Sequence, residues 1–267
     1  FDTTDNNNSA TDSLTLTWTP EIDPPTITVN GGTDDVQVKE DGSVDVTVTS
    51  ALSATADADE YLSVEITGFD PSWGAVTAPV GSFNAAGDTW RVTLSAGASL
   101  DTVLTFTPDA ESDIDLTGLT ATATATDPSA GINASSSDDF NIIVDAVADD
   151  PSLNAAGDTD IEGSMLDVTL AGTLGSDTDG SEHITGYQIS GVPAAVSFNN
   201  GTNAGGGVWT FTPAQIAGLQ AIHADGAFDG SVNLTATVFT TENPVSDGEF
   251  DTTDNNNSAT DSLTLTW

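Results

Sequence analysis

Carboxylates are the residues of this chain whose types and spacing suggest chemistry. Four kinds of acidic cluster recur along its 267 residues. They are the acids of two proline-containing segments (Asp23; Asp149, Asp150), acids near residues 40 and 162 (Glu40, Asp41; Glu162), turns with alternating acids (Asp57, Asp59, Glu60; Asp177, Asp179, Glu182) and pairs spaced by four (Asp109, Asp113; Asp225, Asp229). Alternate residues of a turn can direct two carboxylates at one ion while backbone carbonyls complete its shell, which suits Ca²⁺. We therefore expect these acids to be calcium ligands.

Another metal and solvated turns without an ion are the two kinds of interpretation that compete with calcium. Magnesium ranks lower because it needs stricter octahedral geometry, and zinc prefers Cys or His, of which the chain has only His183 and His223. The acids could also be solvated turns, since Asp favours turns without any ion. The formal net charge is −40, with only Lys39 and Arg91 against 42 acids, and such a charge repels itself in a compact state. This favours a divalent cation for the alternating turns and the linkers, and leaves both interpretations open elsewhere.

The charge also excludes classes of partner. A chain with two cations cannot displace the counterions of nucleic acid, and an anionic membrane surface is excluded for the same reason. No apolar run is long enough to span a bilayer. Motifs of hydrolases, phosphate-binding loops and metalloproteases are missing, so we do not expect an enzyme. With no Cys, no disulfide staples the fold.

The strongest organising signal is an exact repeat. Residues 1–18 return letter for letter as residues 250–267. Self-similarity at a fixed period indicates an array, so the chain is interpreted as one period of near-identical units plus a short overlap. The alternating residues Ser9–Trp18 predict a strand that closes the preceding unit, with Leu14, Leu16 and Trp18 on one face.

The remaining chain divides into a linker at 19–25 and two predicted β domains at 26–148 and 149–267. Alternating apolar residues predict strands. In the first domain these are Val36–Val38, Val44–Val48, Leu62–Ile66, Trp90–Leu94, Val103–Phe106, Leu119–Thr126 and Phe140–Val144. In the second they are Asp167–Leu170, Ile184–Ile189, Val196–Phe198, Trp209–Phe211, Leu219–Ile222, Val232–Phe239 and Ser262–Trp267. One short helical turn is expected after Pro213.

The two domains resemble each other. Glu40–Val48 parallels Glu162–Leu170, and the sequence Leu-Thr-Ala-Thr occurs at Leu119 and again at Leu234. About seven short strands per domain, separated by glycine-rich turns, indicate an antiparallel sandwich of immunoglobulin-like kind. The predicted fold is thus all-β, with two tandem sandwiches behind an orphan strand.

An ordered series of motifs in the second domain resembles the extender repeats of giant RTX adhesins, bacterial surface proteins exported by type I secretion. The series runs from Asp177-Thr-Asp-Gly-Ser-Glu182 and Ile189-Ser-Gly-Val-Pro193 through Trp209–Leu219 to Phe228-Asp-Gly230 and Leu234-Thr-Ala-Thr237. The first domain matches more weakly. The resemblance implies an extracellular, calcium-rigidified stalk whose ligand-binding tip lies elsewhere in the full protein. It also implies that Asp177, Asp179 and Glu182 bind calcium and that linker acids such as Asp150 lock neighbouring domains.

The expected function is therefore a structural extender of a bacterial cell-surface adhesin or filament, with identical repeats as end-to-end partners and Ca²⁺ as the ion. One alternative is a carbohydrate- or ligand-binding module, for which Trp73, Trp90 and Trp209 would have to be exposed; their spacing more often indicates core. Another alternative is a non-covalent polymer in which the free N-terminal strand completes the sandwich of another molecule.

Overall fold

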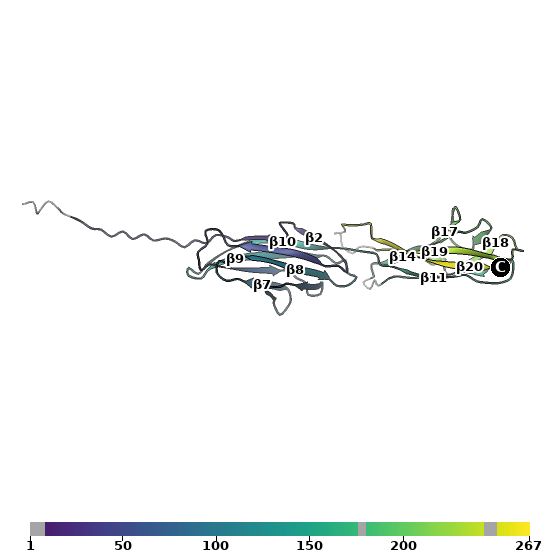
Figure 1. Ribbon diagram of the computed structural model, residues 1–267, viewed down its shortest axis with the longest axis horizontal. Helices are drawn as coiled ribbons and strands as arrows, with labels where there is room; N and C mark the ends of the chain where they lie inside the picture. Colours follow the sequence, from purple (N-terminus) through teal and green to yellow (C-terminus); the bar gives the residue numbers. More distant parts are fainter. Residues whose placement is uncertain (1–8, 176–179, 243–249) are drawn as a thin grey trace, which may run out of the picture.

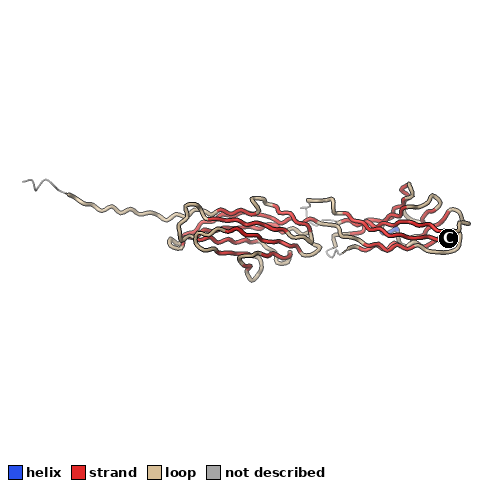
Figure 2. The backbone as a smooth tube through the Cα atoms, in the orientation of Figure 1, coloured by secondary structure: helices blue, strands red, loops and turns tan. Residues whose placement is uncertain are grey.

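The chain folds into an elongated all-β structure, with its strands running along the long axis (Figure 1 and Figure 2). The computed structural model describes residues 9–175, 180–242 and 250–267. Within these ranges the only helical element is the 3-10 turn η1 (Pro213–Gln215), which follows Thr212 as expected from Pro at a helix start. No helix of these residues is long and apolar enough to cross a membrane.

The N-terminal strands form two sheets that pack face to face. The first sheet has the order β1 (Thr26–Val29), β3 (Val44–Ala51), β8 (Leu100–Pro108), β5 (Gly74–Thr77). The second has the order β2 (Asp35–Lys39), β10 (Ile132–Asp145), β9 (Leu116–Asp127), β4 (Tyr61–Thr67), β7 (Thr89–Thr93), β6 (Ser82–Phe83). This is an immunoglobulin-like sandwich, as the sequence predicted.

Alternation along the strands builds the core between these sheets. Every second residue of β4 is buried, including Leu62 and Ile66, and the same period places Phe106 of β8 inside. The ring of Phe106 lies edge-to-face with Phe140 of β10, with ring centroids 6.1 Å apart. Trp90 is fully buried. We call the apolar cluster formed by these side chains the N-terminal core.

One pairing departs from the expected antiparallel arrangement. β2 pairs with β10 in parallel, from Asp35 opposite Asn141 to Lys39 opposite Asp145. The partners lie far apart in sequence, so no hairpin turn forces them to be antiparallel. This pairing brings the only lysine of the chain to the end of β10.

The C-terminal strands surround a second apolar cluster, here called the C-terminal core. Their sheets, in spatial order, are β11 (Ser152–Ala156) with β13 (Thr169–Thr173); β12 (Leu166–Asp167), β18 (Gln220–His223) and β15 (Val196–Phe198); and β16 (Thr202–Gly205), β17 (Val208–Phe211), β14 (His183–Ser190), β19 (Ser231–Thr241) and β20 (Asn256–Thr266). The single strand predicted at Asp167–Leu170 was wrong: at Val168, which donates a backbone hydrogen bond to Leu219, the chain passes from β12 to β13.

The two copies of the exact repeat adopt different structures. The C-terminal copy forms β20, which pairs with β19 over eleven residues. The N-terminal copy, Ser9–Trp18, forms no strand and leads away from the N-terminal core as an extended tail (Figure 1). The strand predicted there is therefore not formed in this chain, because a strand needs a partner.

Candidate metal centre

The parallel ladder between β2 and β10 ends beside three carboxylates. The backbone N–H of Glu40 extends the ladder by donating to the carbonyl of Asp145 at 3.0 Å. Beyond this point the segment 250–255 enters β20 of the C-terminal core. The region where the two cores meet, here called the joint, is therefore made by residues that are far apart in the sequence.

Asp145 ties the end of β10 to the C-terminal segment. Its Oδ1 accepts hydrogen bonds from the backbone N–H groups of Phe250 and Asp251, each at 3.1 Å. The residue is fully buried, and its Oδ2 has no hydrogen-bond partner. An unpaired buried carboxylate oxygen carries a large desolvation penalty, so Asp145 is the residue of the joint that most needs a cation.

Asp251 and Asp254 complete the group. One oxygen from each of these two residues and from Asp145 lie within 4.8 Å of one another. Lys39 Nζ donates to Asp251 Oδ2 at 3.2 Å and also contacts Asp254 Oδ2. The second oxygen of Asp254, Oδ1, is buried without a partner. We call Asp145, Asp251 and Asp254 the joint triad.

The electrostatics of the joint triad leave room for a divalent ion. Three carboxylates and the ammonium of Lys39 give a formal charge of −2. Hydrogen bonds to Asp254 and Asp251 raise the pKa of Lys39, so it stays charged at neutral pH. Hydrogen bonds from Thr253, and then from Lys39, lower the pKa of Asp251. Hard oxygen donors with no thiol or imidazole suit Ca²⁺ or Mg²⁺ rather than zinc.

A second acidic group lies in the same region. Ligand atoms of Asp41, Glu111 and Asp149 also come within 4.8 Å of one another. The backbone N–H of Glu111 donates to Asp41 Oδ1 at 3.1 Å. Asp41 is exposed and the other two are partly buried, so a cation here would be largely hydrated. Asp41 and Asp149 of this group are among the acids that the sequence singled out, from two different clusters, whereas Glu111 was not.

Three other predicted ligands belong to neither group. Asp23 is exposed and accepts hydrogen bonds from the hydroxyls of Ser53 and Thr55. Asp150 accepts from Asn257 Nδ2 at 2.9 Å. Glu40 is buried and accepts the backbone N–H of Val147.

The alternating turns do not gather their acids around one point where they are described. Glu60 is buried and accepts the N–H of Asp57 at 3.1 Å, whereas the side chains of Asp57 and Asp59 are exposed. Glu182 is buried, and its predicted co-ligands Asp177 and Asp179 lie outside the described residues.

The other predicted ligands are scattered. Asp109, Glu162, Asp225 and Asp229 are exposed, and Asp113 is buried. Asp225 is held locally, since its Oδ1 accepts the N–H of Ala227 at 3.0 Å. Within the described ranges, the joint triad and the group with Asp149 are the sets that bring three acids together.

Sequence reasoning missed every member of the joint triad. Asp145 ends a strand, and Asp251 and Asp254 belong to the repeated Phe-Asp-Thr-Thr-Asp sequence, to which no metal-binding role was assigned. The available signal was that this sequence occurs twice, as residues 1–5 and again as residues 250–254. Only the folded structure, in which β10 pairs in parallel with β2, shows that Asp145 joins these two acids.

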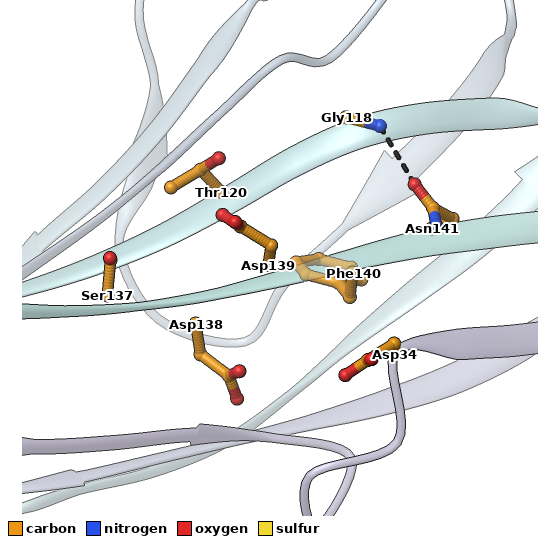
Figure 3. A pocket seen from close by; sticks show the side chains of 8 residues that line it. All are labelled: Asp34, Gly118, Thr120, Ser137, Asp138, Asp139, Phe140 and Asn141. Carbon is orange, nitrogen blue, oxygen red and sulfur yellow. Dashed lines mark hydrogen bonds between the residues drawn. The ribbon is translucent and has the colours of Figure 1, made fainter.

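Figure 3 shows an acidic hollow at the irregular register of β9 and β10. Asp138 accepts the N–H of Val29 at 2.8 Å, and Asn141 links Gly118 to Asp35 through its amide. The one aromatic residue that lines it, Phe140, is buried in the core.

Trp73 and Trp90 are also buried, so neither can form the sugar-stacking face that the ligand-binding alternative requires.

No protein-family model matches the chain, and no curated protein sequence does. Solved structures match at low similarity. The major pilin BcpA of Bacillus cereus is 12% identical with a TM-score of 0.33, covering 82% of this chain and 58% of that one. A fragment of the major pilin GBS80 of Streptococcus agalactiae is 11% identical with a TM-score of 0.33, covering 89% and 91%. The BSP domain of a biofilm-associated protein is 11% identical with a TM-score of 0.25, covering 95% and 61%. Likenesses at these TM-scores assign no function to the chain.

Proposed function

We propose that the chain is a structural extender of an extracellular, cell-surface fibre or adhesin, stiffened at its joint by calcium. The observation that carries the proposal is the joint triad, because it contains a fully buried, unpartnered carboxylate oxygen and joins residues of both cores. A cation bound there would hold Asp145 of β10 to the segment that enters β20. Rotation of one core against the other would then break metal–oxygen bonds.

The shape of the molecule and its composition support the same proposal. The strands of both cores run along one axis (Figure 2), and the exact repeat is typical of an array. Calcium sites of extracellular modules bind at roughly 10⁻⁴ to 10⁻³ M. Such sites fill outside a cell and stay empty in the cytoplasm, where free calcium is far lower.

Calorimetry of the full chain with calcium or with chelator tests the proposal. A site with a dissociation constant near 1 mM stabilises the fold by about 1.4 kcal/mol at 10 mM calcium. This corresponds to a rise in the melting temperature of roughly 3–6 °C. Small-angle scattering should show a narrower distribution of maximum dimensions in calcium than in chelator.

Paired variants identify the site. Asp145→Asn with Asp254→Asn should abolish the calcium-dependent rise, because the amide oxygens bind Ca²⁺ more weakly than carboxylates. Asp101→Asn with Asp139→Asn removes the same charge from exposed positions. This pair should retain the calcium-dependent rise in the melting temperature. If both pairs respond to calcium like the unmodified chain, calcium does not act at the joint triad.

A further inference from the structure

We propose that residues Ser9–Trp18 are a donor strand that takes the β20 position in a second copy of this chain, so that copies link head to tail. The proposal is independent of calcium, because it rests on two identical segments with opposite exposure. In the tail, the side chains of Leu14, Leu16 and Trp18 are 82%, 63% and 80% exposed. Their counterparts at the C-terminus are 3%, 0% and 4% exposed: Leu263, Leu265 and Trp267.

The position that β20 fills is defined by contacts at both ends and along its length. β20 is the edge strand of its sheet and pairs only with β19 there. Asp261 Oδ2 accepts the N–H of Ala155 in β11 at 2.9 Å, and Trp267 Nε1 donates to the carbonyl of Ser164 at 2.9 Å. We call this position, between β19 and β11, the acceptor slot.

The tail carries the counterparts of both side chains that make these hydrogen bonds. Asp12 corresponds to Asp261, and Trp18 corresponds to Trp267. A donor strand from another copy would therefore make the same hydrogen bonds and bury the same apolar side chains as β20 does. The slot cannot distinguish between the two occupants by their contacts.

The tail cannot reach the acceptor slot of its own chain. Seven residues separate Trp18 from β1, and they span at most about 25 Å. The N-terminal core lies between, and its strand β10 alone is 14 residues long, about 46 Å at 3.3 Å per residue. The tail also leaves the molecule at the end away from the C-terminal core (Figure 1). Between separate copies of this chain, the slot that it fills is therefore the slot of another copy. A head-to-tail contact between elongated copies builds an open line unless its rotation closes a ring.

Effective concentration decides which strand occupies the slot. The strand β20 is tethered to its own slot, with an effective concentration in the millimolar range for a short connection. At 10 µM chain, the tail of another copy would thus hold only about 1% of slots at equilibrium. Weakening β20 without changing the tail should shift occupancy strongly towards the donor strand.

The decisive experiment compares three variants after unfolding and refolding at 50 µM, with light scattering after size exclusion. Leu263→Asn with Leu265→Asn cripples β20 and leaves the tail intact, so we expect linear multiples of the 27.1 kDa chain. Leu14→Asn with Leu16→Asn cripples only the tail and should give monomer with an unchanged melting temperature. The variant with all four changes should form no multimers. A monomeric β20 variant, or multimers that persist with all four changes, would overturn the proposal.

Disulfide trapping tests the same register without damaging either strand. Ser262 pairs with Thr235 of β19, and Ser13 is its counterpart in the tail. The native chain has no Cys, so Ser13→Cys with Thr235→Cys should give a ladder of covalent multimers after refolding in a thiol–disulfide buffer. Ser13→Cys with Thr49→Cys, on an exposed position of β3, is the matched control. Equal ladders from both pairs would mean random collision and would contradict the register.

Discussion

Lys39 lies opposite Asp145 in the last register pair of the parallel ladder between β2 and β10. The side chain of Lys39 reaches Asp251 and Asp254 across the joint. A tethered ammonium thus occupies the space beside an acidic triad that also suits a divalent ion. Lysine and calcium would compete for the same oxygens.

Replacing this lysine should strengthen calcium binding at the proposed site. Lys39→Met leaves the joint triad without a competing cation. The calcium midpoint of thermal stabilisation should fall by roughly tenfold or more, because a unit charge about 4 Å from a divalent ion contributes about 2 kcal/mol of repulsion even at the dielectric constant of water. In chelator the same variant should melt at a lower temperature, because three carboxylates then repel one another unopposed.

The control for this variant is Arg91→Met. Arg91 pairs with Glu65 across β7 and β4, but its side chain is 62% exposed, and exposed pairs contribute only about 0–1 kcal/mol. The Arg91→Met variant should leave the calcium midpoint unchanged. Equal shifts in the two variants would indicate a general effect of net charge rather than competition at the joint.

The exact repeat offers a matched pair for core stability. Leu265→Ala empties a fully buried position and should lower the free energy of unfolding of the C-terminal core by about 2–5 kcal/mol. Leu16→Ala makes the same substitution in the same local sequence, but in the exposed tail. It should change the free energy of unfolding by less than about 0.5 kcal/mol. Urea denaturation measures both. A large loss for Leu16→Ala in monomeric protein would mean that the tail packs on the fold.

Gly157 sets how closely β20 approaches the chain before β12. A Cβ at Gly157 would lie 2.1 Å from the carbonyl oxygen of Thr264, which is backbone and cannot move aside. Gly157→Ala should therefore displace β20 and cost about 1–3 kcal/mol in urea denaturation. Gly226→Ala, where a Cβ meets nothing within 4 Å, is the control and should be neutral or slightly stabilising.

Lowering the pH should remove the contribution that ionised Asp127, at the end of β9, makes to the stability of the folded state. Backbone hydrogen bonds from Ala130 and hydrogen bonds from Ser129 hold the pKa of Asp127 below its usual value of 3.8. A lowered pKa in the folded state stabilises above pH 3.8, and this stabilisation is lost as the pH falls through the folded-state value.

Asp127→Asn separates this contribution from the titration of the other acids. The variant should unfold more easily than the native chain at pH 7, and the difference should shrink as the pH falls below about 4. Denaturation at pH 7, 4 and 2.5 measures it. A difference that stays constant with pH would mean that the charge of Asp127 adds nothing to its hydrogen bonds.

The sequence predicted the all-β, immunoglobulin-like fold because alternation carries most of the information in a half-buried strand. The pattern Leu119–Thr126 lies within β9, and Val196–Phe198 coincides with β15. Short strands with little alternation, such as β5 and β16, were not predicted. The strand predicted at Ser9–Trp18 is not formed in the described residues, because its pattern needs a neighbouring strand. That this segment closes a preceding unit stays a prediction.

Candidate ligands were harder to predict than strands. Composition and local spacing singled out exposed turn acids such as Asp57 and Asp59, because both sit in a turn-rich segment. The joint triad depends on a parallel ladder across more than 100 residues and on a segment at the far end of the chain, and local spacing contains neither. The RTX resemblance and the calcium ligands of the alternating turns stay predictions.

The antiparallel register of β19 and β20 has a mechanical consequence. The tail and Trp267 lie at opposite ends of the long axis (Figure 1). A force that pulls these two ends apart therefore acts on β20 parallel to the strand. All eleven paired residues then resist sliding together, whereas a force across the strands would open them one after another. A tether made of such sheets yields by shearing, at a much higher tension than one that peels.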